Sequence, residues 1–143
     1  MILYLDTSCL AKLYLEEAGT EIVKGAAGVA EFIATSMVAE AELRSALARR
    51  RREADLTGAD FRNIKEKFFR EWKDFFRISL TEEISGHAGD LAEKYGLRGF
   101  DAIHLASALF LRSGLAKDSI RFYCADLKLN SAARKEGFHD LFE

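Results

Sequence analysis

Short apolar segments alternate with longer segments of helical periodicity along the whole sequence. Strands are expected at 2–5, 32–34, 78–80 and 121–125, with a further short one at 138–142. Helical patterns fall at 6–14, 19–27, 35–52, 61–75, 81–95, 100–113 and 127–136. Strands that alternate with helices form a mainly parallel sheet, because each helix carries the chain back to the edge where the strand began. The sequence therefore predicts an α/β domain of three layers.

The composition is typical of one globular domain spanning residues 1–143. The chain is 49% hydrophobic and 31% charged, and it contains no proline. No apolar run approaches the length needed to cross a membrane, and the first residues lack the basic leader of a signal peptide. Cys9 and Cys124 both lie in apolar segments, so a disulfide framework is not expected. These features together predict a cytoplasmic protein.

The net charge of −2 is unevenly distributed along the chain. Residues 44–77 carry 11 Lys and Arg against 6 Asp and Glu, an excess of +5, whereas the other residues together carry −7. A basic patch suits the binding of a polyanion, because Lys and Arg displace counterions from phosphates. The same run could equally form a solvated helix face, and the sequence leaves both interpretations open.

Four acidic residues fall where an α/β sheet would gather a site. Asp6 follows the first strand and Asp126 follows the strand at 121–125, so both are expected at the same edge of the sheet. Asp101 begins the helix at 100–113, and Glu42 lies at the margin of the apolar stripe of the helix at 35–52. Each Asp could instead cap a helix or complement its dipole. Because ligands of such sheets bind at the carboxyl ends of the strands, we interpret the four acids as a candidate site.

Crowded carboxylates repel one another unless a cation compensates their charge. Oxygen ligands without a His or Cys cluster favour Mg²⁺ or Mn²⁺, which can activate water for attack on a phosphodiester. Thr7 and Ser36 are candidates to orient the carboxylates, although both could also cap helices. His104 is expected to be a packed, hydrogen-bonded residue rather than a ligand. Arg98 could contact a phosphate or form a salt bridge.

Four short motifs resemble those of the PIN-domain family. They are YLDTS at 4–8, TSMVAEAE at 35–42, LRGFDAIHLA at 97–106 and CAD at 124–126. In the second motif the family's acid comes six residues after the serine, which selects Glu42 rather than Glu40. The third motif is close to the pattern of VapC-type toxins. The family more often has Thr or Ser where Cys124 stands, a departure that removes one supporting hydroxyl. The resemblance covers the chain from Leu3 to about Gly137.

The resemblance implies a PIN-like fold with five parallel strands and endonucleolytic cleavage of RNA that depends on Mg²⁺ or Mn²⁺. Asp6, Glu42, Asp101 and Asp126 would be the catalytic and metal-binding residues, with Asp6 and Asp101 holding the principal ion directly or through water. Metal-activated water would leave 5′-phosphate and 3′-hydroxyl ends. The chain would be the toxin of a VapBC-type toxin–antitoxin pair, usually a homodimer, neutralised by a VapB-type antitoxin and directed at tRNA or ribosomal RNA.

The segment 61–76 contains six aromatic residues spread too widely for one narrow stripe. Most are expected to pack in the core, and the surplus fits a dimer interface or a groove for an antitoxin helix.

Other functions remain possible on these residues alone. A non-catalytic RNA-binding PIN-like domain is the main alternative, and DNA cleavage by the same acids is not excluded. A phosphoacceptor domain fits poorly, because residues 78–81 supply no aspartate.

Overall fold

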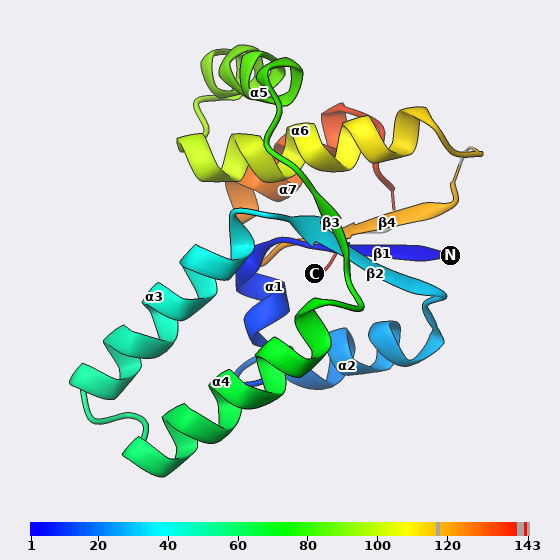
Figure 1. The fold of residues 1–143 in the computed structure, drawn as a ribbon. Helices are drawn as coiled ribbons and strands as arrows, with labels where there is room; N and C mark the ends of the chain where they lie inside the picture. Colours follow the sequence, from blue (N-terminus) through cyan, green and yellow to red (C-terminus); the bar gives the residue numbers. More distant parts are fainter. Residues whose placement is uncertain (117, 140–141, 143) are drawn as a thin grey trace.

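The computed structural model describes residues 1–116, 118–139 and 142 (Figure 1). The strands in these ranges are β1 (Ile2–Leu5), β2 (Phe32–Ser36), β3 (Phe76–Ile78) and β4 (Ile120–Tyr123). The helices are α1 (Thr7–Ala11), α2 (Thr20–Val29), α3 (Ala39–Arg52), α4 (Gly58–Trp72), α5 (Glu82–Tyr95), α6 (Gly99–Ser113) and α7 (Leu127–Lys135). No helix within the described ranges is long and apolar enough to cross a membrane.

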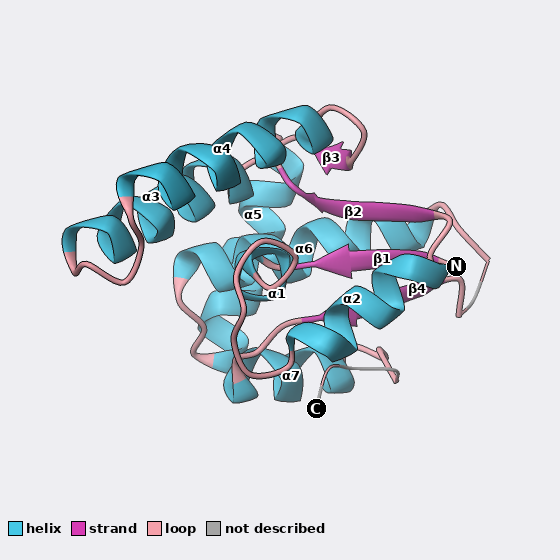
Figure 2. Ribbon diagram, turned by 90° about the horizontal axis from the view of Figure 1, so that it is seen from below, coloured by secondary structure: helices cyan, strands magenta, loops and turns pink. Residues whose placement is uncertain are grey.

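The sheet is parallel throughout, with the strand order β3-β2-β1-β4 (Figure 2). Ile2 of β1 pairs with Phe32 on one side and with Ile120 on the other. The chain moves outward from β1 to β2 and β3, and β4 then pairs with the opposite side of β1. The order of strands therefore reverses between β1 and β4, the position where ligands of open α/β sheets bind. The predicted parallel α/β architecture is confirmed.

Helices cover both faces of the sheet. α5, α6 and α7 lie on one face, and α1, α2, α3 and α4 lie on the other (Figure 1). Successive side chains of a strand point to opposite faces. Tyr4 accordingly joins the buried cluster of α5–α7, whereas Leu3 and Leu5 join the buried cluster that contains Leu43 and Phe68. Two apolar cores thus hold the central strand between them.

The boundaries around β2 and β3 differ from the prediction. Thr35 and Ser36 were expected to cap the following helix, and that expectation is wrong: they are the last residues of β2, and α3 begins at Ala39 without a side-chain cap. Contacts within the sheet hold both residues in β2. Thr35 Oγ1 donates a hydrogen bond to the backbone oxygen of Leu5 at 2.7 Å, and Ser36 pairs with Ile78 of β3. The same register places β3 at Phe76–Ile78 rather than at 78–80.

Two other boundaries bear on the predicted strand count and on the first helix. The sheet has four strands in the part of the chain that the structure describes. The expected fifth strand at 138–142 includes residues 140 and 141, which lie outside the described residues. α1 ends at Ala11 rather than near Tyr14, and hydrogen-bonded turns follow it.

The aromatic residues of α4 and its flanks divide between core and surface. Phe68 and Trp72 are buried, and Phe61 and Phe75 pack against the same cluster. Phe69 and Phe76 are 39% and 54% exposed. The prediction that most of these rings pack in the core is confirmed. The exposed rings of this segment are those of Phe69 and Phe76.

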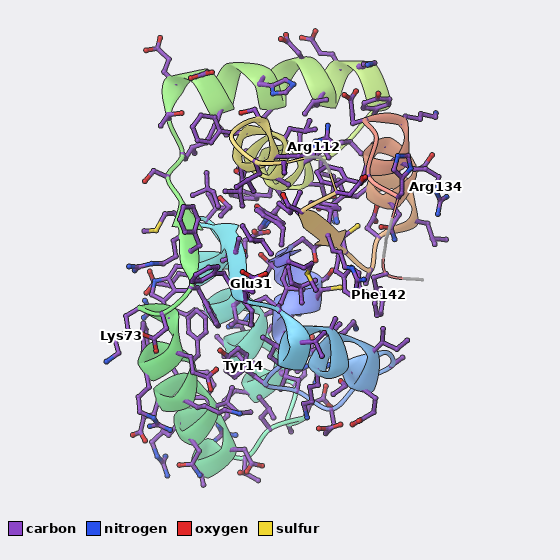
Figure 3. All side chains as sticks on the ribbon, turned by 90° about the vertical axis from the view of Figure 1, so that its right-hand side faces the viewer. Tyr14, Glu31, Lys73, Arg112, Arg134 and Phe142 are labelled. Carbon is purple, nitrogen blue, oxygen red and sulfur yellow. The ribbon has the colours of Figure 1, made fainter. Side chains whose placement is uncertain are left out.

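The segment after α1 is tied to α4 by Tyr14 (Figure 3). The Tyr14 hydroxyl donates to Glu71 at 2.6 Å, and its ring lies edge-on to that of Phe68 at 5.6 Å. The segment after α1 and helix α4, which are far apart in the sequence, are thereby joined on the same side of the sheet.

Candidate active site

Asp6 lies directly after β1 and is the N-cap of α1. Its Oδ1 accepts hydrogen bonds from the backbone N–H of Cys9 at 2.9 Å and from Ser8 Oγ at 2.7 Å. The residue is only 4% exposed. Burial raises the pKa of this carboxyl, and the negative charge of Asp101 acts in the same direction. Asp6 therefore serves as a helix cap and is also a buried anion for which added positive charge would be favourable.

Asp126 occupies the corresponding position after β4. It is the N-cap of α7, with Oδ1 accepting from the backbone N–H of Leu129 at 2.8 Å. Ser8 connects this strand end to the first one, because its Oγ accepts from the backbone N–H of Ala125 at 3.0 Å and donates to Asp6. Ser8 was not among the predicted site residues. Ser8 could have been predicted only from its position between the acids that follow β1 and β4. That position becomes apparent only when the order of the strands is known.

Glu42 is held by two side chains from different elements. Thr7 Oγ1 donates to Glu42 Oε1 at 2.7 Å, and His104 Nε2 lies 2.8 Å from the same oxygen. Burial acts to raise the pKa of Glu42, but the hydrogen bond and charge of His104 and the hydrogen bond from Thr7 outweigh it, so the pKa is lowered. The predicted orienting role of Thr7 has a geometric basis in these contacts.

His104 is buried and fully engaged, as expected for a packed, hydrogen-bonded histidine. Its Nδ1 lies 3.0 Å from the hydroxyl of Tyr4, and its Nε2 also approaches Thr7 Oγ1 at 3.1 Å. Burial raises the pKa of Tyr4 well above its usual value, so the phenol keeps its proton and can donate a hydrogen bond to Nδ1. When Nδ1 accepts this hydrogen bond, Nε2 carries the hydrogen that points to Glu42. Both contacts to Glu42 are made with Oε1, and among the described residues Oε2 accepts no hydrogen bond.

Asp101 lies in the first turn of α6 and forms an ion pair with Arg98. Arg98 Nε is 3.0 Å from Asp101 Oδ2, and the Arg98 side chain is 81% exposed. Of the two roles considered for Arg98, the salt bridge is therefore present. The guanidinium lies largely in solvent, whereas the Asp101 side chain is only 16% exposed.

All four predicted acids line one cavity of about 500 Å³. It lies at the edge of the sheet where the strands end and where α3 and α6 begin (Figure 1). Thr7, Ser8, His104, Arg98, Arg49 and Phe100 also line it. Ser36 does not, and its buried Oγ instead accepts from the backbone N–H of Val38 at 3.3 Å. The lining residues come from four separate parts of the sequence.

The chemistry of these residues fits a hard divalent cation. The acids supply oxygen donors only, and Asp6 is a buried carboxylate whose ionised form a cation would stabilise. Within the described residues no group of three His, Cys, Asp or Glu side chains is arranged to hold an ion directly. Mg²⁺ usually takes only one or two carboxylates from a protein and keeps several waters. The arrangement therefore suits an ion held by one or two of these acids, with water completing its ligands.

Comparison with known proteins identifies the family of the chain. The family model of the PIN domain matches residues 3–123, a range that contains Asp6, Glu42 and Asp101 and ends just before Asp126. Ribonuclease VapC49 of Mycobacterium tuberculosis (strain ATCC 25618 / H37Rv) is 36% identical over 112 residues, covering 76% of this chain and 75% of that protein. Ribonuclease VapC47 of Mycobacterium tuberculosis (strain CDC 1551 / Oshkosh) is 31% identical over an alignment of 144 residues, covering 96% and 93% respectively.

Solved structures agree at the level of the fold. A toxin–antitoxin complex from Klebsiella pneumoniae contains a chain that is 17% identical, with a TM-score of 0.67 over 99% of this chain and 96% of that one. The structure of FitAcB from Neisseria gonorrhoeae matches with a TM-score of 0.66 at 18% identity, over 100% and 97%. On the family model and the sequence relatives, this chain belongs to the PIN-domain family and, within it, to the VapC ribonucleases.

Proposed function

We propose that this chain is an endoribonuclease that depends on Mg²⁺ or Mn²⁺ and acts as the toxin of a VapBC-type toxin–antitoxin pair. One observation carries the proposal: Asp6, Glu42, Asp101 and Asp126, which are dispersed in the sequence, line a single cavity at the switch point of a parallel sheet. Membership of the VapC ribonucleases supports the choice of RNA as the substrate.

The acids have distinct roles in this proposal. Asp6 and Asp101 hold the principal ion, directly or through water, and Glu42 and Asp126 complete the site or support a second ion. When bound, the ion would activate water as the nucleophile and neutralise the charge that develops on the phosphodiester. The products would carry 5′-phosphate and 3′-hydroxyl ends.

The chain's own residues prepare the acids for this role. Ser8 and the N–H of Cys9 fix Asp6, and Thr7 and His104 fix one oxygen of Glu42. These contacts hold one oxygen of each carboxylate in place, so they fix the orientation of the two acids.

The substrate and partners follow from the same family. We propose structured RNA such as tRNA or ribosomal RNA as the target, a VapB-type antitoxin as the inhibitor, and a cytoplasmic homodimer of single-domain chains as the working form. The exposed rings of Phe69 and Phe76 offer apolar surface for a protein partner.

The test is cleavage of total cellular RNA by purified protein freed of antitoxin, with Mg²⁺ or Mn²⁺. We expect discrete fragments that disappear with EDTA, and a rate at least about 100-fold lower for Asp101→Asn, because the metal contributes several kcal/mol to stabilising the transition state. Asp90→Asn, at an exposed position on α5, is the matched control and should cleave normally.

Two outcomes would contradict the proposal. Cleavage that survives both EDTA and Asp101→Asn would assign the chemistry to other residues. RNA binding by folded wild-type protein without any cleavage in Mg²⁺ or Mn²⁺ would favour the non-catalytic RNA-binding alternative.

A further inference from the structure

Phe100 is an exposed aromatic residue in the wall of the acidic cavity. It lies in the first turn of α6, directly before Asp101, and 55% of its surface is exposed. The residues that follow on the inner side of α6, such as Ala102 and Leu105, are fully buried. Phe100 therefore contributes little to the core. In the described part of the chain no other ring or cation lies over its ring, so its faces remain accessible.

The cavity leaves room beside this ring. α3 contributes three small side chains to the lining, those of Ala41, Ser45 and Ala46. α3 and α6 begin at the same edge of the sheet on opposite faces; α6 runs along the sheet, whereas α3 leads away from it (Figure 1). With small residues on α3 and a volume of about 500 Å³, the cavity can admit a flat ring next to Phe100.

The charges around Phe100 are those that suit a nucleotide. Arg98, which is highly exposed, and Arg49, which is also exposed, line the same cavity as the four acids. Guanidinium groups bind phosphate with two parallel hydrogen bonds, and an aromatic face stacks on any base. The cavity thus combines a stacking surface, two cations for flanking phosphates and the acids proposed to act on the scissile phosphate.

We propose that Phe100 is the stacking platform for one unpaired base of the RNA, adjacent to the phosphate that is cleaved. This inference rests on the proposed nuclease function and specifies its substrate: the base at this position must be out of a helix, because a paired base has no free face to offer. Recognition of RNA by proteins commonly uses unstacked bases of loops, bulges and ends in this way. The cleavage site would accordingly lie in a single-stranded segment of a structured RNA.

The test measures binding to a short single-stranded oligoribonucleotide of mixed sequence that carries 2-aminopurine, and to a fully paired duplex. The parent is Glu42→Gln in Mg²⁺, which slows cleavage while leaving Phe100, Arg98 and Asp101 unchanged, and a gel checks that the RNA stays intact. Phe100→Ala should weaken single-strand binding about 5- to 150-fold, the loss expected for one stacked base. It should also abolish the quenching of 2-aminopurine.

Three comparisons separate stacking from a structural effect. Phe100→Trp should retain both the affinity and the quenching, because it restores an aromatic face. Phe110→Ala removes a ring of similar exposure (48%) from the same helix but outside this cavity, and it should bind as the parent does. Duplex binding should change less than about twofold with Phe100→Ala.

The inference is overturned if Phe100→Ala binds the single strand as tightly as the parent, a result that would assign the exposed ring to a protein partner. It is also overturned if single strand and duplex lose affinity equally. Either result can occur while the wild-type protein still cleaves total RNA. In that case the proposed nuclease function is retained and only the role of Phe100 is rejected. If no variant binds RNA and the wild type does not cleave it, the proposed function fails together with the inference.

Discussion

Two acids of the cavity also have a structural role. Asp6 and Asp126 are helix caps and line the candidate site, so capping is confirmed for both, and their part in catalysis stays a proposal. Capping hydrogen bonds orient each carboxylate through Oδ1. For Asp6 this orientation requires burial of a charge, which is unfavourable in the absence of a cation.

We expect Asp6→Asn to be more stable than the wild type in metal-free buffer near neutral pH. The amide can still accept the hydrogen bonds from Ser8 and Cys9, but it carries no charge. The pKa of Asp6 is raised on folding, so protonation of this carboxyl favours the folded state. The free energy of unfolding of the wild type therefore falls as the pH rises from the unfolded-state pKa of the carboxyl through its folded-state pKa. The stability gap should therefore be present at neutral pH and close below about pH 4, where the carboxyl is protonated in both states.

Thermal unfolding in EDTA across this pH range measures the gap. Asp90→Asn, at an exposed position, should show no such pH-dependent difference. A melting temperature for Asp6→Asn below that of the wild type at neutral pH would show that the Asp6 charge is already compensated within the protein.

At the scale of elements, the basic run of the sequence becomes a pair of helices. Residues 44–77 cover most of α3, all of α4 and the turn between them, and the two helices extend together beyond the sheet (Figure 1). Part of this positive charge is neutralised by ion pairs within the chain, because Arg50 pairs with Glu17 and Arg44 pairs with Glu40. Arg49, by contrast, reaches the cavity. The basic run is thus divided between residues in ion pairs within the chain and Arg49 at the cavity, and polyanion binding by this run stays a prediction.

The packing of α4 predicts opposite outcomes for two neighbouring phenylalanines. Phe68 is completely buried against Tyr14 and Trp72, so Phe68→Ala should lower the free energy of unfolding by about 3–5 kcal/mol. Phe69 is 39% exposed, and Cζ of Arg44 lies 5.4 Å from the centre of its ring. Phe69→Ala should therefore lower the free energy of unfolding by no more than about 1 kcal/mol. Urea denaturation of both variants measures the difference. Equal losses would mean that α4 is rotated from the orientation described here.

At the scale of the whole molecule, the cavity joins segments that are distant in the sequence. Asp6 and Asp126 follow adjacent strands, Glu42 belongs to α3 on one face of the sheet and Asp101 to α6 on the other. An ion held between acids from such different parts can bind only the folded chain. Its binding energy is then added to the stability of the fold as a whole.

Mg²⁺ or Mn²⁺ should consequently raise the melting temperature of the wild-type protein. The stabilisation follows mass action and reaches about 2.7 kcal/mol at 100 times the dissociation constant. Asp101→Asn should show a much smaller shift at the same metal concentration, whereas Asp90→Asn should respond as the wild type does. Differential scanning calorimetry with and without the metal makes this comparison. Equal shifts in the melting temperature of Asp101→Asn and of the wild type would show that Asp101 is not a ligand of the ion.

The sequence by itself predicted the class of fold from local periodicity, and it predicted the four acids that line the cavity from their positions after strands or on helices and from the PIN-like motifs. Alternating periodicity marks strands and helices, and an acid that follows a parallel strand must lie at the carboxyl edge of the sheet. The sequence also predicted the helix that begins after Thr81, where Thr81 is the N-cap of α5, and the capping alternative for Asp126, which is the N-cap of α7.

Only the tertiary structure decided which strands are neighbours and which side chains therefore meet. Thr35 and Ser36 have the local character of a helix cap, but pairing with Leu5 and Ile78 in the sheet places them in β2. The hydrogen bond between Ser8 and Ala125 and the contacts among Tyr4, His104 and Glu42 join residues up to 117 positions apart. Packing of the whole chain creates these contacts, and for this reason no periodicity or spacing along the sequence could reveal them.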